Sequence, residues 1–304
     1  MNAIVCERYG PPEVLVLREV DKPRPKKSQL LVRIHAAAVT SGDCRIRAFR
    51  VPARLWLPSK IILGVSRPRK RILGLWFSGV VEEVGNNVTK FRVGDEVWAR
   101  TRDVDFGAYA EYVAISEDVP FISKKPANAT FEDAAAIPFG ALTALYFLRK
   151  GRIAPNSKVL VFGASGSVGT AAVQIAKNLQ ADVTAVTSTS HVQRLGELGA
   201  DAVIDYTKED YWRSAENYDL IFDTVGKTSR RVAKDVLRPD GAYMSVMSSG
   251  HADPKPADLD LIRDMVESGS YDSVIDECYS MEDMVAAQKH VETGHKLGNV
   301  VVRM

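Results

Sequence analysis

The chain has 304 residues, of which 46% are hydrophobic, 26% charged and 8% aromatic. This composition is typical of a globular protein of one or two domains and excludes a disordered, collagen-like or coiled-coil protein. With 40 basic and 38 acidic residues the net charge is +2, so no overall attraction to nucleic acid or to an anionic membrane is expected.

The cysteines bear on the cellular compartment. Cys6, Cys44 and Cys278 lie far apart and form no CxxC motif. They suit neither a disulfide framework nor a cysteine-rich zinc lobe, and they predict a cytoplasmic protein. Glu7 and Arg8 precede any apolar run of signal-peptide length, and no run of about 18 apolar residues is present. We therefore expect no membrane span.

The first 120 residues contain short β segments separated by turn residues, which predict an irregular, mainly antiparallel β-barrel. The expected strands are Val14–Glu19, Leu30–Val39, Gly79–Val84, Asp95–Ala99 and Tyr109–Ile115. From Thr130 the pattern becomes helical, because Thr130 and Asp133 have the spacing of a capping box. Pro138 is expected to break this region into two helices.

After Gly151 strands and helices alternate, which predicts βαβ units and a parallel sheet of five strands. The expected strands are Lys158–Phe162, Val183–Thr187, Ala202–Ile204, Leu220–Phe222 and Ala242–Val246. The expected helices are Val168–Leu179, Val192–Leu198, one that carries Leu259, Ile262 and Val266, and a tail helix capped by Ser280 and Asp283. A last strand, Asn299–Arg303, is expected to close the chain.

The strongest signal is the segment KVLVFGASGSVGTAAVQIAKNLQ, in which a buried strand, a glycine-rich turn and a helix follow one another. The GxxGxxG spacing allows a tight turn and a close approach of backbone N–H groups to a pyrophosphate at the positive end of the helix. This context favours dinucleotide binding over a purely structural turn. The expected contacts are Gly163, Ser165, Gly166, Ser167, Val168 and Gly169.

The end of the second strand of this sheet indicates which dinucleotide binds. An NAD-selective site usually has Asp or Glu there, whereas this chain has no carboxylate from Val186 to Ser190. Hydroxyls suit a 2′-phosphate better, so the sequence predicts NADPH. The expected 2′-phosphate contacts are Thr187, Ser188, His191, Arg194 and Tyr206. For His191 and Arg194, the alternative of a solvated helix residue remains open.

Several further motifs accompany the glycine turn: LGLWFSGVVEEVG, VGDEVWA, GAYAEYV, AAAIPFGALTALYFL, LGADAVIDY and HVETGHKLGNVVV. Together they resemble the medium-chain dehydrogenase/reductase superfamily, and within it the zinc-free quinone oxidoreductase branch that includes zeta-crystallin. The resemblance covers nearly the whole chain. It implies an α/β protein with a GroES-like β-barrel catalytic domain, residues 1–124 and 271–304, around a Rossmann NADP(H)-binding domain with a doubly wound parallel sheet, residues 125–270.

The resemblance also bears on metal. Thr40, Leu75 and Phe139 occupy the positions where zinc-dependent relatives have their catalytic zinc ligands, and Trp76 stands at the acidic neighbouring position. None of these side chains suits zinc. Cys44 lies four residues past the first ligand position and is interpreted as a packed thiol. We therefore expect no metal.

By resemblance, Thr40 faces the nicotinamide, and Asp43 and Arg45 either orient the site or form an internal ion pair that fixes their loop. The resemblance also implies cofactor contacts at Thr143, Val225, Gly226, Val246, Gly298 and Asn299. It implies a zinc-independent, NADPH-dependent reductase of small hydrophobic quinones or α,β-unsaturated carbonyls. The alternative is a dinucleotide-binding sensor, RNA-binding or structural protein with little catalysis.

Two features depart from the resemblance. Between Asp43 and Glu82 there are nine Lys or Arg residues and no acid, interleaved with apolar residues. This basic stretch is interpreted as a lid over the substrate pocket; a solvated loop, an interfacial helix and a nucleic-acid patch are alternatives, of which RNA binding is the least favoured. After Val246 a sixth strand that often pairs across a dimer is missing, so a homodimer with an altered interface is one expectation and the oligomeric state stays open.

Overall fold

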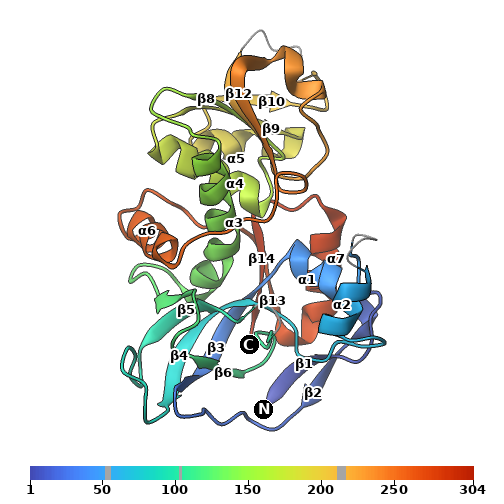
Figure 1. Cartoon of the computed structure of the whole chain (residues 1–304), viewed down its shortest axis with the longest axis vertical. Helices are drawn as coiled ribbons and strands as arrows, with labels where there is room; N and C mark the ends of the chain where they lie inside the picture. Colours follow the sequence, from blue (N-terminus) through green and yellow to red (C-terminus); the bar gives the residue numbers. More distant parts are fainter. Residues whose placement is uncertain (52–55, 103–104, 211–216) are drawn as a thin grey trace. The chain divides into compact units, whose positions relative to one another are not determined.

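The computed structural model describes residues 1–51, 56–102, 105–210 and 217–304. The chain forms two compact units, one of Met1–Ala136 with Ile275–Met304 (unit 1) and one of Ile137–Val274 (unit 2), as the sequence colouring of Figure 1 shows. Unit 1 is therefore built from both ends of the chain, as expected of a domain with an insertion. The domain boundaries expected after residues 124 and 270 stay predictions.

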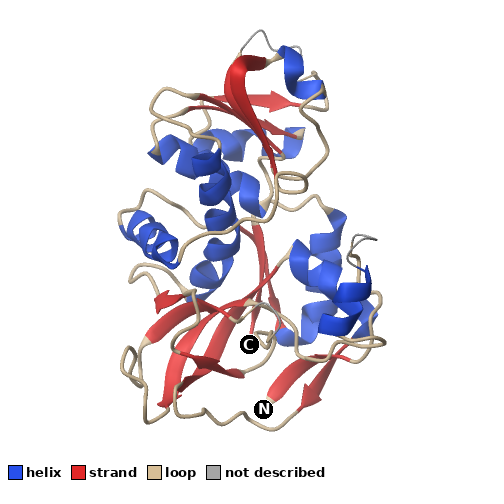
Figure 2. Ribbon diagram, in the orientation of Figure 1, coloured by secondary structure: helices blue, strands red, loops and turns tan. Residues whose placement is uncertain are grey.

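Unit 1 contains a two-stranded and a seven-stranded sheet (Figure 2). β1 (Asn2–Cys6) pairs with β2 (Leu15–Glu19) in the smaller sheet. The larger sheet has the order β13-β14-β3-β4-β5-β7, with β6 also paired to β3. Its strands are β3 (Gln29–Val39), β4 (Trp76–Val84), β5 (Glu96–Arg100), β6 (Tyr112–Ser116), β7 (Ile122–Lys124), β13 (Ile275–Ser280) and β14 (Asn299–Arg303). All pairs are antiparallel except β13 with β14, which is parallel.

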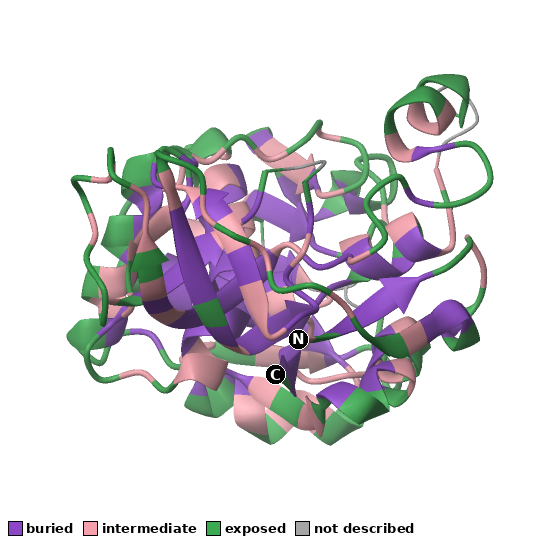
Figure 3. Ribbon diagram, turned by 90° about the horizontal axis from the view of Figure 1, so that it is seen from below, coloured by how far each residue is buried: buried purple, intermediate pink, exposed green. Residues whose placement is uncertain are grey.

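β3 organises unit 1, because it pairs with β14, β4 and β6. Its apolar sequence QLLVRIHAAAV is buried along most of its length, as expected of a central strand and as Figure 3 shows for the strands of this sheet. The short helices of unit 1 are η1 (Pro12–Val14), α1 (Ser41–Arg47), α2 (Trp56–Leu63), η6 (Met281–Asp283) and α7 (Met284–Thr293).

α3 (Phe131–Lys150) begins in unit 1 and continues into unit 2. In unit 1, Ala135 and Ala136 pack against Ala36 and Val301, and these small side chains let the helix approach the sheet closely. The predicted capping box is confirmed: Thr130 Oγ1 accepts from the Asp133 N–H, and Asp133 accepts from the Thr130 N–H.

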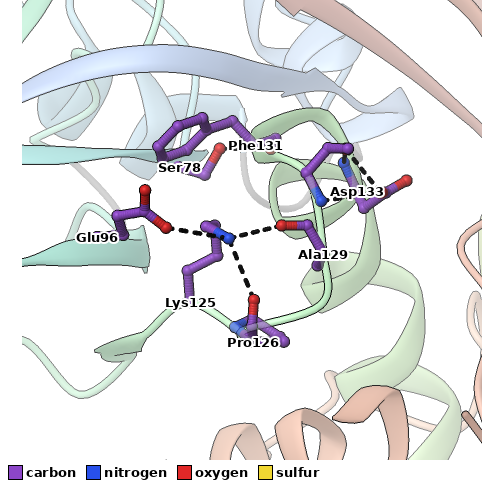
Figure 4. Close-up of polar contacts among 8 residues, drawn as sticks. Ser78, Glu96, Lys125, Pro126, Ala129, Phe131 and Asp133 are labelled. Carbon is purple, nitrogen blue, oxygen red and sulfur yellow. Dashed lines mark hydrogen bonds and ion pairs between the residues drawn. The ribbon is translucent and has the colours of Figure 1, made fainter.

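A buried lysine fixes the segment before α3 (Figure 4). The Lys125 ammonium donates to the carbonyl oxygen atoms of Pro126 and Ala129 and lies 3.1 Å from a carboxylate oxygen of Glu96 on β5. Its side chain is almost fully buried. The burial is tolerated because the charge is both paired and hydrogen-bonded. This contact ties the chain that enters α3 to the sheet.

Pro138 does not break α3, so that prediction is wrong. A proline inside a helix removes one hydrogen bond and costs about 3 kcal/mol. The neighbouring residues Ala134–Ile137 and Ala141–Leu142 are almost fully buried, so packing offsets this cost. By length and composition α3 would suit a membrane span, but 67% of the relevant window is buried inside the protein, as in the core helix of a globular protein.

Unit 2 has a five-stranded sheet in the order β10-β9-β8-β11-β12, and every pair is parallel, as predicted. The strands are β8 (Lys158–Phe162), β9 (Asp182–Thr187), β10 (Ala202–Asp205), β11 (Tyr218–Asp223) and β12 (Leu237–Ser245). The helices are α4 (Ser167–Asn178), η3 (Thr189–His191), α5 (Val192–Glu197), η5 (Val232–Asp235) and α6 (Pro256–Glu267). α4 packs on β8 and β9, and α5 packs on β10 (Figure 2).

The strand order places a topological switch between β8 and β11, where ligands bind in open α/β sheets. β12 is the last strand of the sheet. Residues 246–255, all of them described, contain no strand and lead directly into α6. The end of the tail differs from the expectation of one helix: Ser280 is the N-cap of η6 and Asp283 is the N-cap of α7, which begins at Met284, and neither side chain makes a capping hydrogen bond.

Candidate functional site

The turn between β8 and α4 depends on its glycines. Gly163 has φ +74°, and a Cβ there would lie 2.7 Å from a methyl group of Val225. A Cβ on Gly169 would lie 2.3 Å from the Gly163 carbonyl oxygen. At Gly166, in contrast, the nearest atom to an added Cβ is 3.8 Å away. Two glycines therefore permit the turn itself, whereas a Cβ at Gly166 would make only an ordinary van der Waals contact.

Gly166 stands directly at the N-terminus of α4. Gly166 is the N-cap and offers no side-chain cap, and α4 begins at Ser167 with Val168 and Gly169 in its first turn. The first N–H groups of a helix have no acceptor within the helix and carry the positive end of its dipole. Thr170 Oγ1 lies 3.1 Å from the Gly166 carbonyl oxygen and secures the turn from inside. This geometry fits the pyrophosphate of a dinucleotide.

The end of β11 lies beside this turn. Thr224 Oγ1 lies 3.0 Å and 2.9 Å from the carbonyl oxygen atoms of Phe162 and Gly163, and so joins the ends of β8 and β11. Val225 and Gly226, two predicted cofactor contacts, follow directly and are exposed. At the switch point of the sheet, the Thr224 side chain therefore links the ends of β8 and β11, and the exposed residues Val225 and Gly226 lie next to this link.

Asp223 shapes the turn that presents these residues. One carboxylate oxygen accepts from the N–H groups of Val225 (3.0 Å) and Gly226 (2.7 Å). The other accepts from the Thr228 N–H (3.0 Å) and the Tyr243 hydroxyl (3.1 Å). Val246, also a predicted contact, donates its N–H to the Asp223 carbonyl oxygen. Sequence analysis did not assign Asp223, although an aspartate directly after a strand signals such a turn.

The ends of β9 and β10 carry the predicted 2′-phosphate contacts. The Tyr206 N–H donates to the Thr187 carbonyl oxygen, which brings these two residues together. Tyr206 is exposed, but Thr187 is 1% exposed and its hydroxyl has no hydrogen-bond partner in the described part of the chain. Ser188 is half-buried, with its hydroxyl 3.1 Å from that of Ser190. Ser188 and Tyr206 are therefore better placed than Thr187 to contact a ligand.

A carboxylate that sequence analysis missed lies here. Asp205, at the end of β10, accepts from the hydroxyls of Thr189 (2.5 Å) and Thr207 (2.7 Å) and lies 3.3 Å from the Lys208 ammonium. The hydrogen bonds from Thr189 and Thr207 hold the pKa of Asp205 well below its usual value. Its negative charge is thus satisfied internally rather than presented bare to a ligand.

Arg194 has partners of its own. Its guanidinium lies 2.7 Å from the Asp272 carboxylate and 3.2 Å from that of Glu197. His191, at the end of η3, is half-buried. Thr143, within α3, donates its hydroxyl to the Phe139 carbonyl oxygen at 2.7 Å. The roles expected for these three residues stay predictions.

In unit 1, Thr40 and Asp43 form a capping box at the start of α1. Thr40 Oγ1 accepts from the Asp43 N–H and donates to Asp43 Oδ2 at 2.6 Å, and the Thr40 N–H donates to the same oxygen at 2.9 Å. Both side chains are buried. Burial raises the pKa of Asp43, although the hydrogen bonds from Thr40 lower it. A buried carboxyl group with a raised pKa thus lies next to the Thr40 hydroxyl.

The cations that follow on α1 differ in exposure. Arg45 is exposed, whereas Arg47 is fully buried and lies 2.6 Å from the Glu292 carboxylate on α7. Arg47 therefore joins α1 to α7. Of the basic stretch, Arg54 and its apolar neighbour Leu55 lie outside the described residues.

The start of β14 was also predicted to lie at the cofactor. Gly298 is buried with φ +70°, and Asn299 is 8% exposed at the first position of the strand. The Lys296 ammonium donates to the Gly298 carbonyl oxygen. Burial lowers the pKa of Lys296 to about 8. Sequence analysis missed this lysine because its sequence context gives no signal of burial.

The zinc-ligand positions of the family hold other groups. The Thr40 hydroxyl is hydrogen-bonded to Asp43. Leu75 and Phe139, the latter within α3, have apolar side chains that offer no ligand atom to zinc. In the parts of the chain that the structure describes, no group of three or more His, Cys, Asp or Glu residues is placed to hold a metal ion.

The fold and the glycine turn define a two-domain dinucleotide-binding oxidoreductase. A profile described as "Alcohol dehydrogenase GroES-like domain" matches residues 26–126, and one described as "Zinc-binding dehydrogenase" matches residues 167–287. The chain belongs to the medium-chain dehydrogenase/reductase superfamily, which confirms the resemblance and the fold class.

Several curated relatives match almost the whole chain, among them proteins of Solanum lycopersicum and Arabidopsis thaliana. A 2-methylene-furan-3-one reductase of Solanum lycopersicum is 31% identical over 99% of this chain and 79% of the relative. A chloroplastic NADPH-dependent alkenal/one oxidoreductase of Arabidopsis thaliana is 30% identical with the same coverage.

Two solved structures share the fold over the full chain. A quinone oxidoreductase from Coxiella burnetii has a TM-score of 0.84 and 26% identity, and covers 100% of this chain and 99% of that one. A protein described as an NAD-dependent alcohol dehydrogenase has a TM-score of 0.87 and 27% identity, and each chain is covered completely. Because a protein described as a quinone oxidoreductase and one described as an alcohol dehydrogenase share this fold, the fold alone does not decide the reaction.

Proposed function

We propose that this protein is a zinc-independent, NADPH-dependent reductase that transfers hydride to quinones or α,β-unsaturated carbonyl compounds. The observation that carries the proposal is the β8–α4 turn, where Gly166 has room for a Cβ and is the N-cap of α4 without a side-chain capping hydrogen bond. The names of the relatives support the reaction, because they include a reductase of a conjugated ketone and an NADPH-dependent alkenal/one oxidoreductase.

The residues of the turn would hold the pyrophosphate. Ser167, Val168 and Gly169 form the first turn of α4, where backbone N–H groups have no acceptor within the helix, and we propose that these groups donate to the phosphate oxygens. Ser165 and Ser167 are half-buried and add hydroxyl groups at the same turn. Val225, Gly226 and Val246 would border the nicotinamide half, since they lie at the ends of β11 and β12.

The 2′-phosphate would be bound at the ends of β9 and β10. Ser188, His191 and Tyr206 are accessible there, and Lys208 neutralises Asp205. For Arg194 to contribute, it must exchange its ion pair with Asp272 for one with the phosphate. An exposed ion pair is worth only about 0.2–1 kcal/mol, so this exchange is inexpensive.

NADPH supplies the hydride in this chemistry, and activated alkenes and quinones accept it without a Lewis acid. We propose that the Thr40 hydroxyl steadies the oxygen atom of the substrate. In the structure the Thr40 hydroxyl donates its proton to Asp43 Oδ2. Burial raises the pKa of Asp43. When Asp43 is protonated it donates to Thr40 Oγ1, and the Thr40 hydroxyl proton is then free to bond to the substrate. Thr143, Gly298 and Asn299 are proposed to contact the nicotinamide half, and Arg45 to orient the α1 segment.

The test is consumption of NADPH, with NADH alongside, against a panel of ortho- and para-quinones, enals and enones, on protein verified as zinc-free by metal analysis. We expect turnover that favours NADPH with one acceptor class. Tight NADPH binding without turnover on any acceptor would contradict the reductase and indicate a sensor or structural protein.

Compartment and assembly are further proposals. The three cysteines are free thiols, which supports a reducing compartment such as the cytoplasm. One relative is chloroplastic, so the family as a whole is not restricted to the cytoplasm. Among the described residues of unit 2, β10 and β12 are the edge strands of the sheet, and a homodimer contact by strand pairing would form at one of these two edges.

A further inference from the structure

The helix α2 exposes an unusual amount of apolar surface. None of its described residues is buried. Isolated exposed apolar side chains are normal in globular proteins, but a contiguous group marks an interaction surface. The group on and just after α2 comprises Trp56 (51% exposed), Leu57 (63%), Ile61 (61%), Ile62 (55%) and Val65 (72%).

α2 is held in place from its inner side. The Lys60 ammonium lies 4.2 Å from the ring centroid of Phe49 and 5.1 Å from that of Tyr9, and it donates to the Val65 carbonyl oxygen. The Tyr9 hydroxyl donates to the Gly64 carbonyl oxygen at 3.1 Å. Leu63, at the end of the helix, packs against the core of unit 1. These anchors fix the inner face of α2, so its outer apolar side chains remain exposed.

A basic segment lies directly at the C-terminal end of α2. The Arg69 N–H donates to the Leu63 carbonyl oxygen at 2.7 Å, which folds the chain back onto the helix. Gly64 makes this reversal possible, because it has φ +118° and a Cβ there would lie 2.2 Å from the Arg67 carbonyl oxygen. The side chains of Arg67, Arg69 and Arg71 are exposed. We call α2 together with residues 64–71 the basic apolar surface.

Residues 44–81 contain neither Asp nor Glu, but Arg69, Lys70 and Arg71 line a cavity of unit 1 that Glu7, Glu19, Asp21 and Asp105 also line. Lys70 lies 3.8 Å from the Asp105 carboxylate, an exposed and loose contact. Arg47 and Arg50 belong to a different site, because both pair with Glu292. The cationic character of the basic apolar surface therefore comes from the residues that follow α2.

We propose that the basic apolar surface docks this protein on an anionic lipid bilayer. Exposed aliphatic side chains with arginines beside them suit the boundary between the headgroups and the acyl chains of an anionic bilayer. Leu57, Ile61, Ile62 and Val65 enter this boundary, and Arg67, Arg69 and Arg71 meet the headgroup phosphates.

Other occupants fit less well. A second copy of this chain would bring two positively charged segments together. Nucleic acid favours planar side chains for stacking, whereas the outer residues here are mainly aliphatic. The proposal does not depend on the reductase activity, although a protein held at a bilayer would meet lipid-soluble substrates at high local concentration.

The experiment is flotation of the full-length chain with vesicles of phosphatidylcholine, with and without about one third phosphatidylglycerol. We expect binding to the anionic vesicles at least about tenfold stronger than to the neutral vesicles, and loss of this difference at high salt. Equal binding to both vesicles, or binding to neither, would overturn the proposal.

Paired variants locate the contact. Leu57→Ser with Ile61→Ser removes two outer apolar groups, and Arg67→Glu with Arg69→Glu reverses two charges. Each pair is expected to lower binding to the anionic vesicles by at least about tenfold. The matched control is Val93→Ser, an equally exposed apolar residue of unit 1 remote in sequence from α2, which is expected to leave binding unchanged. Unfolding temperature and NADPH affinity serve as measures of intact folding in all variants.

Two outcomes would replace the membrane with another role. If Leu57→Ser with Ile61→Ser abolishes a concentration-dependent dimer seen by light scattering, while vesicles do not bind, the surface joins two copies. If the same variant raises KM in the absence of vesicles and vesicle binding is unchanged, α2 is a substrate lid. Either result contradicts the proposal independently of whether the reductase function holds.

Discussion

The two ends of the proposed cofactor site in unit 2 are built on different principles. At the β8–α4 turn the backbone makes the site, because Gly163 and Gly169 occupy positions where any Cβ would collide with neighbouring atoms. At the ends of β9 and β10 side chains make the site, and they already bond to one another: Asp205 with Thr189, and Arg194 with Asp272.

This difference explains what each end is able to select. A backbone turn with a helix N-terminus recognises a pyrophosphate, which all nicotinamide dinucleotides share. To distinguish NADPH from NADH, side chains must bind the 2′-phosphate. Arg194 must then exchange its ion pair with Asp272 for one with this phosphate. The account therefore places affinity at the turn and preference for NADPH at the strand ends.

The largest effect is expected from Gly166→Asp. The structure has room for the side chain, and aspartate is a favourable N-cap, so the fold is retained. The new carboxylate would face the pyrophosphate and lower NADPH and NADH affinity by more than about 1,000-fold, measured by fluorescence titration. Gly196→Asp is the matched control, because Gly196 in α5 also has room for a Cβ. Unchanged affinity in Gly166→Asp would refute the placement of the pyrophosphate.

Asp223→Asn tests whether the switch-point turn beside Gly163 depends on one side chain. Each carboxylate oxygen of Asp223 accepts two hydrogen bonds, one oxygen from Val225 and Gly226 and the other from Thr228 and Tyr243. In the asparagine variant an NH₂ group replaces one of these oxygens. Because NH₂ is itself a donor, one pair of donors loses its acceptor. We expect a loss of about 2–3 kcal/mol in the free energy of unfolding, measured by urea denaturation. Asp240→Asn, at an exposed site in β12, is the control. A change no larger than in the control would mean that the backbone alone holds this turn.

A backbone group and a side chain also meet at the start of β14, where the Gly298 carbonyl oxygen accepts a hydrogen bond from the Lys296 ammonium. The unfolded chain keeps the proton of Lys296 up to its ordinary pKa of 10.5, whereas the folded protein loses it above about 8. Between these pH values the unfolded state binds more protons, so the free energy of unfolding rises with pH by on the order of 2 kcal/mol.

Lys296→Met removes this contribution. Denaturation of the wild type and the variant at both ends of that pH range is expected to show that the wild type gains stability relative to the variant as pH rises. Lys234→Met, at an exposed lysine, serves as control. If the difference in free energy of unfolding between the wild type and Lys296→Met does not change with pH, the pKa of Lys296 is not lowered in the folded protein.

The smallest effect concerns Arg194 at the side-chain end of the site. Asp272→Asn removes the partner that holds the guanidinium at 2.7 Å. Since an exposed ion pair is worth about 0.2–1 kcal/mol, we expect NADPH to bind about two- to fivefold tighter, with NADH affinity unchanged. Arg194→Ala should weaken NADPH selectively. If neither change separates the two dinucleotides in a titration, Arg194 does not contact the 2′-phosphate.

Prediction from sequence succeeded where structure is local. The segment from β8 to α4 was predicted within one residue at each bound, because its apolar strand, glycines and helix lie within the 21 residues 158–178 and act on each other directly. The last strand, Asn299–Arg303, was predicted with the same bounds that the structure has.

Prediction failed where distant segments decide. β1 and β13 were missed, because β1 acquires its strand geometry from β2, and β13 depends on a parallel partner in β14. The prediction that Pro138 breaks the helix also failed. The contacts that keep α3 continuous come from residues far away in the sequence, and the local pattern around Pro138 does not reveal them. In the same way, the internal partners of Asp205 and Arg194 are set by tertiary structure and carry no local signal.

The most direct test of the account is a pair of equilibrium titrations of the wild-type protein with NADPH and with NADH, since the central claim is a dinucleotide held at the glycine turn and selected by its 2′-phosphate. The account predicts saturable binding of both, with NADPH at least about tenfold tighter, the value of one good charge-assisted hydrogen bond. Equal affinities, or tighter binding of NADH, would contradict it.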